Sequence, residues 1–296
     1  MGWLKRAVVG LLALCSLDAK AAELPALPEA PALPPAQSLG NWYVRGDLGA
    51  TSYSTGRWTQ AVTGLAQGDQ LVSAGFVSRS VRDSGFVGAG LGYEIHPWVR
   101  VDITTDYRSS AALRGNFQES AFNPSTPLAF LGKTEFAGSL QTAVVMANAY
   151  ADLGTWYGFT PYVGAGIGLA HHELSGFTGN GVAISGTDFT SINANSTPVP
   201  VAFLPGVAKT RTDPAWSLMA GISYSISPNL KLDLGYRHLD LGDIRSGPIN
   251  CLCRESFAGV KVRNIASNEI RLGVRWVFGE AGPMLGTTDD LPEIPR

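Results

Sequence analysis

The chain has 296 residues with 35 glycines, only 16% charged residues and a formal net charge of −2. The low charge and ordinary apolar content make disordered and coiled-coil classes poor fits, and collagen is excluded because no Gly-X-Y repeat is present. The acidic balance also argues against nucleic acid as a partner, because that binding depends on many Lys and Arg residues that neutralise phosphates.

The first residues have the pattern of a secretory signal. Two basic residues precede an apolar run over residues 7–17, and Ala19 and Ala21 place small residues at both positions that a signal peptidase reads. We therefore expect a signal peptide at residues 1–21. A membrane anchor is the alternative, but eleven apolar residues are too few to cross a ~30 Å hydrocarbon core as a helix.

A proline-rich segment follows at residues 22–40. It holds five prolines between Glu23 and Ser38 and has no period that a helix or a sheet could use. We expect an extended periplasmic linker there. The alternative is a proline-rich docking segment for a partner.

Alternation of apolar and polar residues, the period of a β-strand, begins after this segment. In residues 268–278, Ile270 and Leu272 share one face, whereas Glu269 and Arg271 share the other. The same pattern marks three more strands, at residues 98–107, 216–226 and 230–237. Four fainter strands carry glycine on their second face, which would leave room for bulkier neighbours; they lie at residues 42–52, 86–95, 140–152 and 161–170.

The connections between these strands alternate between short and long. Three are tight turns, whereas four run to two dozen residues or more, at 55–81, 109–137, 174–212 and 241–264. Soluble domains rarely contain four structureless loops of that length, but outer-membrane barrels combine tight periplasmic turns with long external loops. We therefore predict an all-β fold, an eight-stranded antiparallel up-and-down transmembrane β-barrel over residues 41–278 with four long external loops.

The physics of a bilayer agrees with this prediction. A sheet survives in hydrocarbon only if it closes on itself, with its apolar face toward lipid and its polar face toward the lumen. Aromatic residues should then mark both interfaces: Trp42, Trp98, Trp156, Tyr157, Trp276 and Phe278 on the periplasmic side, and Tyr53, Tyr107 and Trp216 on the external side. The alternative, a water-soluble sandwich or lipocalin-like barrel, would require glycine-rich strands to fill an apolar interior, which they do poorly.

The predicted lumen is highly charged. Eight strands enclose a space only wide enough for side chains to fill. Because an unpaired buried charge costs several kcal/mol, we expect a mutually paired plug in which each charge has a cross-strand partner. The alternative is an ion-selective pore, and the sequence leaves open whether the chain conducts ions. The polar face carries eleven charges: Arg45, Asp47, Glu94, Arg100, Asp102, Lys231, Asp233, Arg237, Glu269, Arg271 and Arg275.

Three segments, PYVGAGIGLA, DLGYRHLDLGD and the final RLGVRWVF, resemble opacity-type and OmpA-like outer-membrane barrels, in particular the alphaproteobacterial Omp25/Omp31 porin-family group. The resemblance covers residues 42–278 and implies a place in the cell outer membrane, in contact with outer-membrane lipid and lipopolysaccharide. It also implies that barrel-assembly machinery reads the last strand, with Phe278 as its terminal aromatic residue. Residues 279–296 depart from the family pattern, which usually ends at this aromatic residue, and are too few for the peptidoglycan-binding domain of OmpA.

The same resemblance implies structural support of the envelope, a host or environmental ligand at the loops and, in some members, haem binding or pore activity. We expect a non-enzymatic protein. His238 and Asp240 form the only His–acid pair on a clear strand, and no serine occupies a neighbouring position on that face.

Two pairs of reactive residues, each close together in the sequence, remain. His171 and His172 lie where the fifth strand enters the longest loop, and neighbours in a strand point to opposite faces, so we expect a solvated rim pair; haem ligation is the alternative. Cys251 and Cys253 lie in the fourth long loop, where a disulfide would be strained and zinc would need two further ligands, so their redox state stays open. We expect no resident cofactor, metal site or catalytic residue.

These observations favour a structural, surface-exposed outer-membrane barrel that contributes to envelope integrity and surface contacts. The alternatives are a narrow porin or a haem-binding uptake protein, and an adhesin is a third class.

Overall fold

The computed structural model describes residues 42–60, 67–193, 195–204, 208–251, 256–257 and 259–279. The expected signal peptide, the linker, nearly all of the tail after Phe278 and Cys253 lie outside the described residues. None of the described residues forms a helix that is long and apolar enough to cross a membrane.

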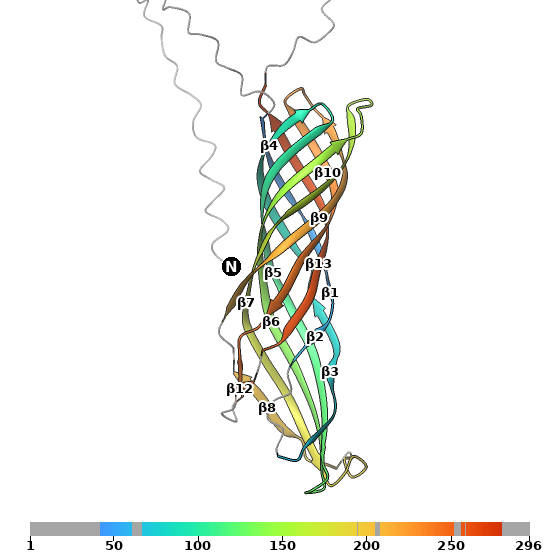
Figure 1. Ribbon diagram of the computed structural model, residues 1–296, viewed down its shortest axis with the longest axis vertical. Helices are drawn as coiled ribbons and strands as arrows, with labels where there is room; N and C mark the ends of the chain where they lie inside the picture. Colours follow the sequence, from blue (N-terminus) through green and yellow to red (C-terminus); the bar gives the residue numbers. More distant parts are fainter. Residues whose placement is uncertain are drawn as a thin grey trace, which may run out of the picture. The chain divides into compact units, whose positions relative to one another are not determined.

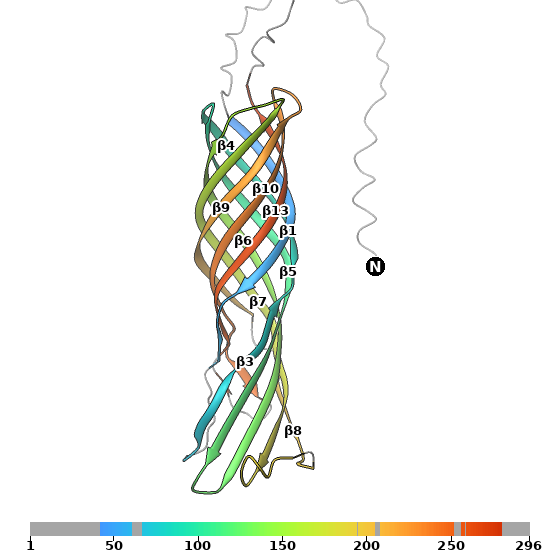
Figure 2. The ribbon, with the colours of Figure 1, turned by 90° about the vertical axis from the view of Figure 1, so that its right-hand side faces the viewer.

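Eight strands form a closed ring. They are β1 (Trp42–Thr55), β4 (Ser84–His96), β5 (Val99–Asn123), β6 (Leu128–Asp152), β7 (Phe159–Gly186), β9 (Lys209–Ser225), β10 (Leu230–Arg245) and β13 (Lys261–Val277). Each pairs antiparallel with the next in this order, and β1 pairs with β13 to close the ring (Figures 1 and 2). The predicted eight-stranded up-and-down topology is confirmed.

One end of the ring, which we call the short-turn end, carries the predicted tight turns. These turns join β4 to β5, β6 to β7, and β9 to β10. Gly154 and Gly158 have φ angles of 113° and 84° in the second of them, values that favour glycine. The first strand begins and the last strand ends at the same end, where the Phe278 amide donates a hydrogen bond of 2.7 Å to the Trp42 carbonyl.

The opposite end differs from the prediction of long structureless loops. The segment 109–137 is mostly a strand hairpin, because β5 and β6 stay paired up to Asn123 and Leu128. The strand β3 (Gln70–Val81) pairs with β5, and β8 (Val199–Leu204) pairs with β7. Three short strands add to this end: β2 (Trp58–Thr59), β11 (Ile249–Cys251) and β12 (Ser256–Phe257).

We call the part of the sheet beyond the ring, formed by β3, β8 and the outer halves of β5, β6 and β7, the extension (Figures 1 and 2). The four long connections lie at one end of the ring, as predicted, and only the expectation that they are structureless was wrong, because the alternation changes phase. The register shifts between Arg108 and Ala111, so inward positions are even-numbered before this bulge and odd-numbered after it. A strict period of two read from the sequence therefore ends at Tyr107.

Glycines on the inner face make room for large side chains from adjacent strands, as the sequence predicted. Gly92 lies directly opposite Tyr43, and a Cβ at Gly92 would overlap the Tyr43 ring. Gly46, on the outer face of β1, has no atom within 4 Å of the position that a Cβ would take.

We expect Gly92→Val to destabilise the barrel by about 1–3 kcal/mol, because the added side chain overpacks the lumen. Gly46→Val is the matched control and should leave the free energy of unfolding close to that of the unmodified protein. Urea unfolding of protein refolded in detergent, followed by tryptophan fluorescence, measures both. Equal stabilities for the two variants would contradict this packing.

Candidate functional site: the barrel interior and its extension

Paired charges fill the lumen toward the short-turn end. All eleven charges predicted for the lumen form ion pairs, which confirms the expected plug. Sequence reasoning missed three more members, Asp106, Arg108 and Asp152. Asp106 and Arg108 have the same even-numbered parity as Asp102. This pattern could have identified these two of the three residues.

The centre of this plug is a network of buried arginines and carboxylates. Arg237 lies 2.5 Å from Asp106 and 2.6 Å from Glu269, and Arg108 lies 2.5 Å from Glu269. Arg271 adds a contact of 3.3 Å to Asp106. All five side chains are at least nine-tenths buried, so each charge depends on its partners rather than on water.

Aromatic rings support the same layer. The Arg100 guanidinium stacks between Tyr150 and Tyr162, with distances of 4.2 and 4.7 Å to the ring centroids, and its Nε donates to Asp152 at 3.1 Å. The Phe86 ring lies 5.1 Å from the Arg271 guanidinium carbon. Cation–π contacts of this kind stabilise a desolvated cation that has few carboxylate partners.

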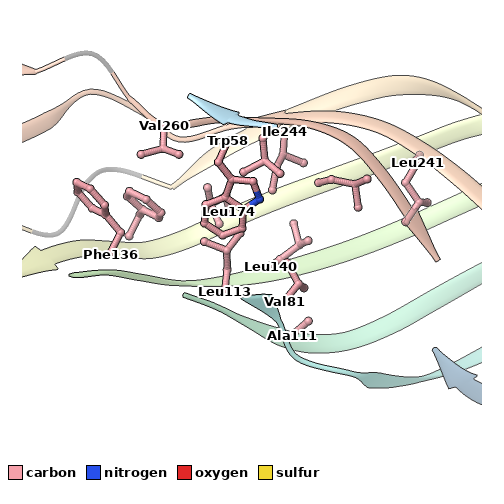
Figure 3. Close-up of a cluster of buried hydrophobic side chains, with 14 of the residues drawn as sticks. Trp58, Val81, Ala111, Leu113, Phe136, Leu140, Leu174, Leu241, Ile244 and Val260 are labelled. Atoms are coloured by element: carbon pink, nitrogen blue, oxygen red, sulfur yellow. The ribbon is translucent and has the colours of Figure 1, made fainter. Parts of the chain in front are cut away.

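An apolar cluster fills the interior between the charged layer and the extension. It draws Leu113 from β5, Leu140 from β6, Leu174 from β7 and Ile244 from β10, and all four are at most 3% exposed (Figure 3). Trp58 from β2 lies among them (Figure 3). The apolar cluster and the centre of the charged layer are therefore closed to solvent, whereas the side chains of Glu94 and Lys231 are 23% and 25% exposed.

One aromatic prediction is wrong. Tyr53, expected at the external interface, packs against this apolar cluster, and its hydroxyl pairs with Ser84 Oγ at 3.3 Å. Tyr53 shares the odd-numbered parity of Arg45 and Asp47, which face the interior, so its ring points inward rather than toward lipid. Tyr107 and Trp216 are 55% and 45% exposed on the outer face, as predicted.

The outer face of the extension has an apolar half and a polar half. Directly opposed residues share a face, so the register places Leu131 beside Ile184, and Val182 between Lys133 and Pro200. We call Leu131, Val182, Ile184 and Pro200 the apolar patch; Leu131 is 39% and Val182 40% exposed. The polar half lies next to it on β3 and β5 and consists mostly of hydroxyl and amide side chains: Ser73, Ser78, Asn116, Gln118 and Ser120. Val72 and Val77 at the two register shifts of β3 are also exposed there, at 60% and 62%.

Hydrogen bonds order the tip and the polar half of the extension. Asp188 accepts bonds of 2.7 Å from the Thr190 hydroxyl and from the Ser191 amide, and these bonds lower the pKa of its carboxyl group. Ser73 and Ser120 hydroxyls lie 2.7 Å apart between β3 and β5. Hydrogen bonds therefore hold the surface of the extension in a defined shape, and the extension is not a set of unpaired loops.

The two adjacent histidines point to opposite faces. His172 is buried, with Nδ1 3.0 Å from Thr142 Oγ1 and Nε2 donating to the Leu241 carbonyl at 2.8 Å. His171 is exposed, and its Nδ1 lies 2.9 Å from Thr212 Oγ1. The expected solvated rim pair is therefore wrong for His172, because its imidazole is buried in the interior. The two imidazoles do not converge on one ligand, and both ring nitrogens of His172 already have partners.

The other reactive residues are also separated. His238 Nδ1 donates to Asn268 Oδ1 at 2.9 Å, whereas Asp240 accepts from the Gly242 amide, so Asp240 does not orient the imidazole. Across the part of the chain that the structure describes, no group of three or more His, Cys, Asp or Glu residues is arranged to hold a metal. The backbone of Cys251 pairs with that of Phe203 in β8. A disulfide between Cys251 and Cys253 would involve side chains that lie outside the described part of the structure.

We expect Glu269→Ala to lower the free energy of unfolding by about 3–5 kcal/mol, because it leaves the buried Arg108 without a carboxylate partner and Arg237 with Asp106 alone. Asp243→Ala is the control: Asp243 pairs with Lys261 at 3.1 Å in a partly exposed position, and such pairs contribute about 0–1 kcal/mol. Urea unfolding in detergent measures the two losses. Losses of equal size would show that the lumen charges are hydrated rather than mutually paired.

Comparison with known proteins gives consistent matches. The family model described as "Outer membrane protein beta-barrel domain" matches residues 7–278. An uncharacterised protein of Brucella abortus (strain 2308) is 30% identical over 213 residues, which cover 69% of each chain. The outer membrane protein PagN of Salmonella typhimurium is 24% identical, over 71% of this chain and 80% of PagN. A putative adhesin of Rickettsia felis is 27% identical, over 81% of this chain and 90% of the adhesin.

The closed ring, the charged lumen and the exposed apolar outer face are the features that such a family requires in a bilayer. The chain thus belongs to the outer membrane protein beta-barrel domain family and is a protein of the cell outer membrane.

Proposed function

We propose that the protein is a non-enzymatic surface-attachment barrel: the ring anchors it in the outer membrane and supports the envelope, and the extension carries the surface that contacts a host or environmental ligand. The observation that carries the proposal is the apolar patch, which lies on paired strands beyond the ring.

The position of the aromatic residues supports an external location for this patch. Trp42, Trp98 and Trp276 are exposed at the short-turn end, and Tyr107 and Trp216 are exposed near the other end of the ring. Aromatic belts of this kind sit at the two membrane interfaces, and short turns face the periplasm. The extension starts beyond Tyr107, so its outer face meets the surroundings of the cell.

The composition of the extension supports contact with a macromolecule. Leu131 and Val182 are apolar side chains that are about 40% exposed. Full burial of such a side chain contributes about 1.5–3 kcal/mol, so burial of the exposed part of each against a partner would contribute about 0.6–1.2 kcal/mol. Exposed apolar groups that cluster beside polar groups mark interaction sites. The neighbouring hydroxyl and amide groups supply hydrogen bonds around the rim. The name of the Rickettsia felis relative, a putative adhesin, agrees with this role.

We expect the double variant Leu131→Asp, Val182→Asp, displayed on Escherichia coli, to reduce attachment to cultured epithelial cells at least about tenfold, since a tenfold loss needs only ~1.4 kcal/mol. Val199→Asp is the matched control. Val199 is 59% exposed on β8 but lies on the face opposite to Pro200, so this variant should attach normally.

Heat-modifiable migration on a gel verifies that every variant folds. The proposal fails if cells that display the unmodified protein attach no better than cells without it, or if the control variant loses attachment equally.

The alternative of a narrow porin meets a physical obstacle. An ion that crossed the lumen would have to pass the arginine–carboxylate layer and then the apolar cluster, and both layers exclude solvent. Displacement of a buried ion pair leaves uncompensated charge, which is costly.

We therefore expect the purified protein, reconstituted in a planar bilayer, to give no stable single-channel steps. A general porin reconstituted in parallel serves as the positive control for insertion. Reproducible steps from the protein would favour the transport function.

A further inference from the structure

We propose that a groove on the lipid face of the barrel holds one acyl chain of a glycerophospholipid of the periplasmic leaflet as a retained lipid. The groove crosses the outer face of β4, β5, β6 and β7, with Trp42 of β1 at its edge. It has a volume of about 630 Å³ and is lined almost wholly by apolar side chains.

Two cross-strand rows of outward-facing side chains form this groove. The first row has large residues on one side followed by two alanines, whereas the second has a single alanine between large residues. The row nearer the short-turn end runs Trp42, Tyr93, Val101, Ala149 and Ala165, and the next row runs Leu91, Ile103, Ala147 and Ile167.

The small side chains lower the surface along β6 between two walls. Ile103 on β5 and Ile167 on β7 are 64% and 72% exposed and stand above Ala147, which lies between them in the same row. The backbones of β5 and β7 are two strand spacings apart, about 9.5 Å. The side chains of Ile103 and Ile167 occupy part of this width. The channel that remains between them accommodates a single hydrocarbon chain.

The same width argues against a second copy of the barrel as the occupant. A neighbouring barrel has a broad convex face, so it would rest on Ile103 and Ile167 and leave the alanine floor uncovered. An acyl chain contacts the floor and both walls at once, and the summed dispersion energy of those contacts favours its retention.

The lipid belongs to the periplasmic leaflet because of the aromatic pair at the groove's end. The rings of Trp42 and Tyr93 pack edge to face with centroids 5.3 Å apart at the short-turn end. Such rings sit at the level of lipid headgroups. The polar residues of the lining turn inward: Asp102 accepts from Arg45 at 3.1 Å, and Asn148 donates to Asp102 at 2.7 Å. The groove therefore recognises the hydrocarbon chain and not a particular headgroup.

Native mass spectrometry tests the proposal on protein refolded in detergent with 1-palmitoyl-2-oleoyl-phosphatidylethanolamine as the probe. We expect one phospholipid to remain on the unmodified protein when the detergent is stripped. The variant Ala147→Leu, Ala149→Leu fills the floor and should lose this lipid. Ala220→Leu, at an exposed outward alanine on β9 that is not part of the groove, is the matched control and should keep it.

Heat-modifiable migration verifies folding of each variant, and Ala165→Leu carries the test if the double variant does not fold. The proposal is overturned if the unmodified protein retains no lipid, if the groove variants retain as much as the control, or if they abolish a dimer peak instead.

Discussion

The whole architecture depends on the requirement that every backbone N–H and C=O within hydrocarbon has a partner in the protein. The pairing of β1 with β13, from Tyr43 opposite Val277 to Thr55 opposite Ile265, meets this requirement for the two strands that would otherwise be edges. Once the ring is closed, alternate side chains must face lipid and lumen. An eight-stranded ring then leaves so narrow an interior that its charged residues have to neutralise one another.

The interior of the barrel is filled by charged side chains near one end and by apolar side chains near the other. Near the short-turn end, charges pair across the lumen, and glycines such as Gly92 provide the space that the large arginine and tyrosine side chains occupy. Toward the extension, where β2 and β3 join the sheet, leucine, isoleucine and phenylalanine replace the charges. The apolar cluster ties the extension to the ring, so the apolar patch is positioned by the same sheet that forms the barrel.

Much of this structure follows from the sequence, and the exceptions have physical causes. The four clear strands and the eleven lumen charges were predictable because a strand within a bilayer must alternate strictly. The extension was missed because a bulge after Arg108 and the left-handed Gly176, with φ of 60°, break that period. The apolar patch could not be predicted either, because it depends on the register that brings Leu131 opposite Ile184. The hydrogen bond of His172 could not be predicted either, because its partner, the Leu241 carbonyl, lies 69 positions away in the sequence.

The closing strand pair also constrains how the molecule is made. Tyr43 cannot meet Val277 until almost the entire polypeptide has been exported. Contacts between such distant parts of a chain form slowly. Until they form, the incomplete sheet exposes two long unpaired strand edges that are prone to aggregate. During biogenesis, closure of the ring therefore competes with aggregation. The unpaired edges of β1 and β13 need protection until they pair with each other.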